Sequence, residues 1–148
     1  MRLNELRFVK ISDIDTDRMQ VRIRQGKGKK DRYVVLSQYI KEKLPSYLAS
    51  YKPEIYLFEG NSPGHEMGER SIQNIIFEAL KKTNIKKKVS LHTLRHSFAT
   101  HLLEDGVDLY TIQKLLGHNQ IRSTIMYLHI AQVVPKTAKS PLDTLYNF

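Results

Sequence analysis

The sequence predicts an α+β fold that is mainly helical and contains a small three-stranded antiparallel sheet. Segments of β-type composition lie before residue 37, whereas apolar residues recur at helical spacing after it. Strands that precede a run of helices are typical of the α+β class. The length of 148 residues corresponds to about one domain.

Three segments near the N-terminus predict the sheet. Residues 8–11 can form a short strand, and the run 19–23 alternates apolar with polar side chains, which is typical of a half-buried strand. Residues 32–36 are again rich in residues that favour strands. A glycine-containing turn at 25–30 joins the last two segments, so the three together predict a β-meander.

The rest of the chain predicts helices. Residues 1–8 have the pattern of the last turns of a helix whose beginning is absent. Ser37 is a good N-cap for the next helix, in which Pro45 predicts a kink or a break. Ser71 should cap a further helix that ends near Asn84. Three more helices are predicted over residues 92–103, 108–116 and 123–131.

Composition excludes several classes of protein. No stretch approaches the ~20 apolar residues that a membrane helix needs, and the N-terminal segment lacks the apolar core of a signal peptide. The chain has no cysteine, which excludes disulfides, thiolate nucleophiles and cysteine-bound metal centres. We therefore expect a cytoplasmic protein without a membrane partner.

The charge balance predicts a nucleic acid partner. Lys and Arg number 24 against 15 Asp and Glu, so the net charge is +9 and the isoelectric point is about 9.7. Basic residues are concentrated in the runs 22–32 and 81–88, which is the pattern expected of a surface that binds a polyanion. The side chains expected to contact DNA are Arg22, Arg24, Lys29, Lys30, Lys81, Lys82, Lys86, Lys87 and Lys88.

A second group of residues has the composition of a phosphate-transfer site. Arginine binds phosphate oxygens bidentately and stays charged at any working pH, while histidine exchanges protons near neutrality. A tyrosine hydroxyl is a weak nucleophile at its ordinary pKa of about 10 and needs activation. Fixed cations can stabilise a pentacoordinate phosphorus transition state without a metal. The residues suited to such tyrosine attack on a phosphodiester are Arg2, Lys27, His92, Arg95, His118 and Tyr127.

Alternatives exist for some of these residues. Lys29 and Lys30 neighbour Lys27, which is favoured because it lies between two glycines at the tip of the turn. His96 follows His92 by one helical turn, as in some zinc sites, but no Glu lies between them and no third ligand has suitable spacing. We therefore expect no metal and no other cofactor. On the same predicted helix, 92–103, the residues expected to lie in the hydrophobic core are Phe98, Leu102 and Leu103.

Residues 91–130 resemble the active-site half of the tyrosine recombinases, the family of the phage integrases, Cre and the Xer proteins. The family pattern is an Arg followed by a Glu on a helix, a hairpin Lys, H-x-x-R, L-G-H, and a Tyr nine residues further on. Here Arg95 and His118 are 23 residues apart, and Tyr127 follows His118 by nine. Each motif alone is weak, but five in this order are specific, and the resemblance covers residues 1 to about 132.

The resemblance implies a role for each of these residues. Tyr127 would be the nucleophile that forms a 3′-phosphotyrosyl link to DNA and frees a 5′ hydroxyl. Lys27 would protonate the leaving 5′ oxygen, and His92 would assist proton transfer. The scissile phosphate would be bound by Arg2, Arg95 and His118, with Glu5 orienting Arg2.

The resemblance also implies an assembly. Double-stranded DNA would be the partner, with no small-molecule substrate, and the full-length protein would form a homotetramer on DNA. Residues 1–131 would be the catalytic domain, truncated at its N-terminus so that it lacks its first helices and the upstream core-binding domain. Residues 132–148 would be a tail that can dock in trans. The protein would be bacterial or phage-encoded and associated with the nucleoid.

Two other functions are compatible with these residues. One is a non-catalytic DNA-binding module that has lost strand transfer. The other is an enzyme resembling the type IB topoisomerases, which share the Arg-Lys-Arg-His-Tyr chemistry. Because all six catalytic positions are filled and the spacing and short length fit a recombinase better, we expect site-specific recombination or integration.

Overall fold

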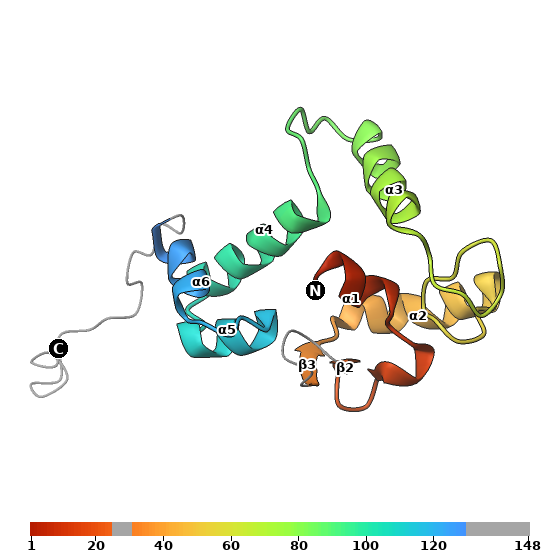
Figure 1. Ribbon diagram of the computed structural model, residues 1–148, viewed down its shortest axis with the longest axis horizontal. Coiled ribbons are helices and arrows are strands. Elements are labelled where there is room, and N and C mark those ends of the chain that lie inside the picture. The colour runs from red at the N-terminus through yellow and green to blue at the C-terminus, as the bar shows by residue number, and fades with distance from the viewer. Residues whose placement is uncertain (25–30, 130–148) are drawn as a thin grey trace, which may run out of the picture.

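The computed structural model describes residues 1–24 and 31–129 and confirms a mainly helical fold with a three-stranded antiparallel sheet (Figure 1). Among these residues, no helix is long and apolar enough to cross a membrane. The elements are α1 (Leu3–Arg7), η1 (Ile11–Asp13), β1 (Ile14–Asp15), β2 (Gln20–Ile23), β3 (Arg32–Val35), α2 (Gln38–Tyr51), α3 (Glu69–Lys81), α4 (Leu91–Glu104), α5 (Leu109–Leu116), α6 (Arg122–Ile125) and η2 (Met126–His129).

The sheet has the order β1-β2-β3, and both pairs of strands are antiparallel. The predicted alternation is confirmed in β2, where Val21 and Ile23 are buried and Arg22 between them is exposed. The first predicted strand, at 8–11, is reduced to an antiparallel bridge between Lys10 and Tyr56 and is not part of the sheet. A carboxylate oxygen of Asp13 accepts a hydrogen bond from the backbone N–H of Lys10 at 3.1 Å, so the chain makes a 3₁₀ turn there and pairs with β2 only afterwards.

Helix α2 begins where the sequence predicts and continues past its proline. The Ser37 hydroxyl accepts the backbone N–H of Ile40 at 3.2 Å, which confirms the cap. The predicted break at Pro45 does not occur, because the helix is continuous from Gln38 to Tyr51. No residue of α2 is buried, so the carbonyl group that loses its partner to Pro45 is not enclosed in the core.

The later helices follow the prediction with shifted ends. Helix α3 is capped by Gly68 instead of Ser71 and ends at Lys81 instead of near Asn84. Helices α4 and α5 begin within one residue of the predicted positions. The last predicted helix is a short α-helix followed by the 3₁₀ turn η2, and residues 130–131 lie outside the described residues.

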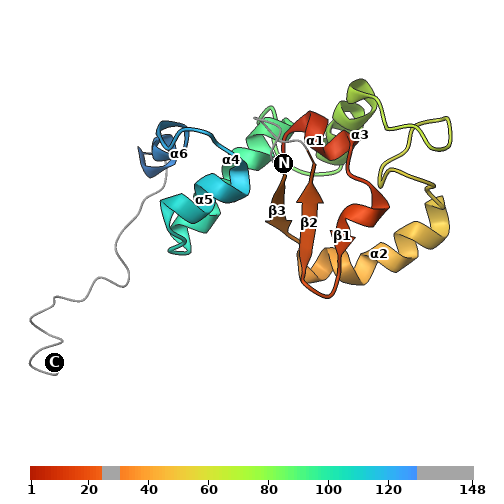
Figure 2. The same cartoon turned by 60° about the horizontal axis from the view of Figure 1, so that its bottom comes forward.

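The core has two parts. Figure 2 shows the elements that hold them, the sheet on one side and α4 with α5 on the other. One lies beneath the sheet and is formed by Val9, Val21, Ile23 and Leu36. The other joins α4, α5 and η2 and is formed by Ala99, Leu103, Ile112, Leu116 and Tyr127. Phe98 was expected in this core, but it is 45% exposed because the neighbouring Ala99 faces the core instead. Helix α5 contacts β3 and so connects the two parts.

Candidate active site

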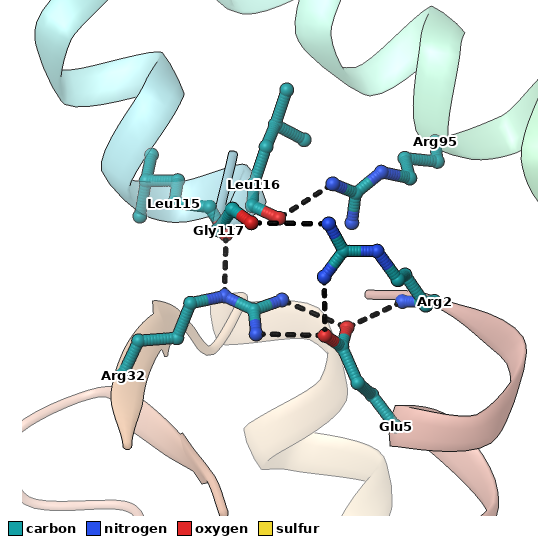
Figure 3. Close-up of polar contacts among 7 residues, drawn as sticks. All are labelled: Arg2, Glu5, Arg32, Arg95, Leu115, Leu116 and Gly117. Carbon is teal, nitrogen blue, oxygen red and sulfur yellow. Dashed lines mark hydrogen bonds and ion pairs between the residues drawn. The ribbon is translucent and has the colours of Figure 1, made fainter. Parts of the chain in front are cut away.

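Three arginines converge on the C-terminal end of α5 (Figure 3). Arg32 donates from Nε to the carbonyl oxygen of Leu115 at 3.2 Å, and Arg95 donates to that of Leu116. Arg2 donates from Nη2 to that of Gly117 at 3.0 Å. Carbonyl groups in the last turn of a helix have no partner within the helix and lie at its negative end. The end of α5 therefore holds three like charges close together.

The turn that ends α5 requires a glycine. Gly117 has a φ of 65°, which places it in the left-handed region. A Cβ atom there would lie 2.8 Å from Nε of Arg32. The glycine of the L-G-H motif thus closes the helix and also leaves room for an arginine that comes from β3.

A single carboxylate bridges two of these arginines. Each oxygen of Glu5 accepts one hydrogen bond from Arg2, at 2.6 and 2.9 Å, and one from the Arg32 guanidinium, at 2.8 and 2.9 Å. Burial by itself would raise the pKa of Glu5, but the hydrogen bonds and charges of Arg32 and Arg2 lower it to about 2. Glu5 lies against Arg2, where the sequence predicts it, and it is ionised at neutral pH.

Arg95 is the most deeply buried of the three arginines. The residue is 6% exposed, and its Nη1 is buried without a hydrogen-bond partner. Burial, followed by the like charges of Arg2 and Arg32, lowers its pKa. A buried guanidinium with an unused donor is costly unless an anion binds beside it. A phosphate oxygen would satisfy that donor.

A cavity adjoins two of these arginines. It has a volume of about 240 Å³, lies between α1 and the start of α4, and is lined in part by Arg2, His92 and Arg95. One water molecule occupies roughly 30 Å³, so a phosphate group has room to enter. The structure thus brings three of the predicted residues to one cavity.

His92 is paired with another histidine. Its Nε2 lies 2.6 Å from Nε2 of His96, so one of the two nitrogens carries the proton of a hydrogen bond. Burial, followed by the charges of His92 and Arg95, lowers the pKa of His96. Within the two described segments, no three His, Cys, Asp or Glu side chains are grouped as metal ligands.

His118 is held by a buried hydroxyl group. Its Nδ1 lies 3.0 Å from Oγ1 of Thr124, a residue that is fully buried. Burial, followed by the charges of Arg95 and Arg2, lowers the pKa of His118 to about 4, so the ring is neutral at pH 7. Sequence reasoning missed Thr124. The available signal was its position three residues before Tyr127, which places both on one helical face.

Tyr127 lies beside His118 in the helical part of the core. It is 2% exposed, and its ring is parallel to that of His118 at 6.4 Å between centroids. The centroid of the His96 ring lies 5.4 Å from that of the Tyr127 ring. Burial raises the pKa of Tyr127, while the nearby charge of Arg95 acts in the opposite direction.

The basic residues predicted to contact DNA have different surroundings. Lys29 and Lys30 lie outside the described residues, and so does Lys27, which is predicted to be catalytic. Arg22 donates to Asp31 and Arg24 donates to Asp13, each at a shortest distance of 2.6 Å. All residues from 81 to 88 are exposed, and within this run Lys81 contacts Glu78 at 2.8 Å.

Comparisons with known proteins identify the family of the chain. The model of the phage integrase family matches residues 1–133. A tyrosine recombinase of Pseudothermotoga lettingae is 39% identical over 132 residues, which are 88% of this chain and 45% of the relative. The crystal structure of XerA recombinase is 34% identical with a TM-score of 0.78, over 99% of this chain and 53% of the other.

A second solved structure is that of the XerH site-specific recombinase bound to its difH substrate. It is 30% identical with a TM-score of 0.71, over 87% of this chain and 39% of the other. The chain thus spans about half the length of the curated relatives it matches. With its helices, its sheet and the order of its motifs in agreement, the chain belongs to the phage integrase family of tyrosine recombinases.

Proposed function

We propose that this chain carries the catalytic centre of a site-specific recombinase that acts on double-stranded DNA. The observation that supports this most strongly is the grouping of Arg2, Arg95 and His118 at the end of α5, beside Tyr127. Two fixed cations and a neutral imidazole next to a tyrosine suit attack on a phosphodiester better than they suit DNA binding alone.

The proposed reaction exchanges one phosphodiester for another. The hydroxyl oxygen of Tyr127 attacks phosphorus, and the bond from phosphorus to the 5′ oxygen breaks. The tyrosine proton passes to a base and the 5′ oxygen takes up a proton, for which His92 and Lys27 are the proposed carriers. Attack by the 5′ hydroxyl of another strand on the phosphotyrosine then restores the tyrosine and completes strand exchange.

Arg2 and Arg95 are proposed to stabilise the charge that develops on the phosphate. Both guanidiniums are already fixed by carbonyl groups of α5, so little reorganisation is needed during the reaction. Such fixed cations can supply the charge stabilisation that a metal supplies in other phosphoryl-transfer enzymes. We therefore propose cleavage that is independent of metal ions.

His118 is proposed to donate a hydrogen bond to the phosphate. If the Thr124 hydroxyl donates to Nδ1 of His118, the proton of the neutral ring resides on Nε2. The low pKa of about 4 keeps the ring in this neutral form at pH 7. Nε2 can then act as a donor without adding a further positive charge.

The wider DNA surface and the assembly are also proposals. The exposed run 81–88 is the best supported contact with the DNA backbone, because its lysines lie at the surface. A tetramer on DNA and docking of the tail 132–148 in trans rest on the family resemblance, and the tail lies outside the described residues. The proposed location of this protein, at the nucleoid in the bacterial cytoplasm, also rests on the family resemblance.

Covalent capture tests the proposed reaction. The chain would be incubated, in the presence of a chelator, with DNA duplexes that carry a randomised sequence next to a nick. DNA that is covalently linked to protein would then be separated and sequenced. We expect an adduct through a 3′ phosphate that depends on Tyr127. The Tyr127→Phe variant should bind the same DNA and give no adduct, because it lacks only the nucleophilic oxygen.

The alternatives give different results. A non-catalytic binding module would bind the duplexes without forming an adduct in either protein. A topoisomerase-like enzyme would form the adduct without a preferred sequence, would relax supercoiled plasmid, and would not join strands of two captured duplexes. Loss of the adduct in chelator, with recovery in magnesium, would contradict the metal-free mechanism.

A further inference from the structure

We propose that Arg32 is a positioning residue for the phosphate site, and that it fixes Arg2 and balances the charge of Glu5. None of the five motifs includes Arg32, which is the first residue of β3. This inference rests on the proposed function, because the importance of Arg2 rests on the phosphate that it is proposed to bind.

The contacts of Arg32 are those of a fixed side chain. Its guanidinium meets both oxygens of Glu5 at 2.9 and 2.8 Å, while its Nε donates to the carbonyl oxygen of Leu115. The side chains of Arg32 and Glu5 are only 12% and 9% exposed. Exposed ion pairs contribute little, but a bidentate pair shielded from water is well defined in geometry and strong.

Arg32 contacts the two groups that fix the Arg2 guanidinium. The Arg2 guanidinium lies between the Glu5 carboxylate and the Gly117 carbonyl oxygen, as Figure 3 shows. Arg32 binds that same carboxylate and the same turn of α5, and it packs where a Cβ of Gly117 would be. Movement of Arg32 would therefore displace Glu5 and the end of α5 together.

Arg32 also changes the charge of the site. Arg2 and Glu5 alone form an ion pair with no net charge, so the carboxylate would offset the attraction of Arg2 for a phosphate. With Arg32 bound to the other side of Glu5, and Arg95 nearby, positive charge is in excess. This excess lets Glu5 orient Arg2 while the site remains attractive to an anion.

A purely structural role would predict a different outcome, and Arg7 provides a matched control. Arg7 donates from Nε to the carbonyl oxygen of Met67 at 2.9 Å and contacts Glu66 and Glu69 at 3.2 Å. It has the same types of contact as Arg32, but its partners lie outside the phosphate site. Arg7→Gln therefore measures the cost of losing such contacts.

The experiment compares four variants of the whole chain: Arg32→Gln, Arg7→Gln, Glu5→Gln and the double variant Arg32→Gln/Glu5→Gln. Thermal unfolding and the single-turnover rate of adduct formation at saturating DNA are measured for each. Without Arg32, the Glu5 carboxylate offsets the positive charge of Arg2, so we expect Arg32→Gln to slow the reaction roughly 30- to 300-fold. Arg7→Gln should slow it by less than about threefold.

Rescue separates charge balance from structure. Glu5→Gln in the Arg32→Gln background removes the carboxylate that offsets the charge of Arg2 and leaves an amide oxygen that can accept from Arg2. We therefore expect the double variant to be at least about tenfold faster than Arg32→Gln. Additive losses, or an Arg32→Gln rate no lower than that of Arg7→Gln, would overturn the proposal.

Binding of inorganic phosphate distinguishes this inference from the proposed function. Titration followed by NMR shifts should give about tenfold weaker binding in Arg32→Gln and recovery in the double variant. If the wild-type chain forms no adduct, but Arg32→Gln weakens phosphate binding and the double variant restores it, the proposed reaction fails and the role of Arg32 stands. If phosphate binding is equal in all four variants and the wild type, Arg32 has no such role.

Discussion

The chain has two arginine-rich regions, and they differ in how their charges are matched. At the end of α5, Arg2, Arg32 and Arg95 gather around the single carboxylate of Glu5. At the end of β2, Arg22 and Arg24 (the sheet arginines) each have a carboxylate partner. Arg22 is paired with Asp31, and Arg24 is paired with the buried Asp13. Only the first region combines closely held arginines with an excess of positive charge.

From this difference we expect the local balance of charge, and not the number of basic residues, to determine where an anion binds. The sheet arginines have their carboxylate partners at 2.6 Å, so a phosphate would have to displace those partners. At the end of α5, carbonyl groups hold guanidiniums in place without neutralising them. A buried donor of Arg95 remains without a partner there. The predictions below test this distinction.

The largest effect is expected from Arg95. Loss of one fixed donor to a developing oxyanion costs about 10²- to 10³-fold in rate, so Arg95→Gln should slow adduct formation by that factor. Arg24→Gln on the sheet should slow it by no more than about threefold. Rates would be measured at saturating DNA, and circular dichroism would show that each variant is folded. Similar losses in both variants would remove the distinction between the two regions.

The linear motifs could be predicted from the sequence because they depend on local spacing. His92 and Arg95 are one helical turn apart, and Glu5 is one turn from Arg2, so short-range periodicity places each pair together. The helices were also predictable, since a cap such as Ser37 and an end such as Gly117 act locally. The family resemblance supplied the roles that spacing alone could not give.

The contacts that complete the site could not be predicted because they join distant parts of the chain. Arg32 is 83 residues from Leu115, and in the sequence it is one cation of a basic run. The same run gave Arg22 and Arg24 as DNA contacts, because a count of charges does not reveal their partners. The first strand was misplaced for a similar reason, because Lys10 pairs with Tyr56, far along the chain, and not with β2.

The next effect concerns acid stability at the end of α5. The pKa of Glu5 is lowered from 4.5 to about 2, so its carboxylate stabilises the folded chain above pH 4.5. That contribution is lost as the pH falls from about 4.5 to about 2. Each pKa unit is worth 1.36 kcal/mol, so the loss is about 3 kcal/mol at most. Chemical denaturation at several pH values would measure the free energy of unfolding.

The matched comparison for this prediction is Glu5→Gln, which cannot ionise at that position. Its free energy of unfolding should be lower than that of the wild type above pH 4.5, and the gap should narrow as the pH falls. A gap that stays constant down to pH 3 would mean that the Arg2 and Arg32 contacts do not favour the ionised carboxylate.

A smaller effect is expected from Thr124. Replacement by Val keeps the shape but removes the hydroxyl that faces Nδ1 of His118, so the ring loses the partner that sets its tautomer. A neutral hydrogen bond contributes about 1 kcal/mol, so the cleavage rate should fall roughly five- to tenfold. Thr124→Ser keeps the hydroxyl and should retain most of the rate. Equal rates for Thr124→Val and Thr124→Ser would assign the hydroxyl no role in catalysis.

The smallest effect is expected for the sheet arginines in DNA binding, and it is the sharpest test of the comparison. Each phosphate contact with a basic side chain contributes about 0.9 to the slope of log affinity against log salt. Lys86 and Lys87 are exposed, so changing both to Gln should lower the magnitude of the slope by up to about 1.8. Arg22 and Arg24 are held by Asp31 and Asp13. If a phosphate replaced those carboxylates, they would take up cations from solution, so the net release of counterions would be smaller. Changing both arginines to Gln should therefore lower the slope by less than about 0.5, measured by fluorescence anisotropy on a 30-base-pair duplex. If the arginine pair instead changes the slope as much as the lysine pair, then carboxylate matching does not decide which cations meet DNA, and the sheet belongs to the DNA-binding surface.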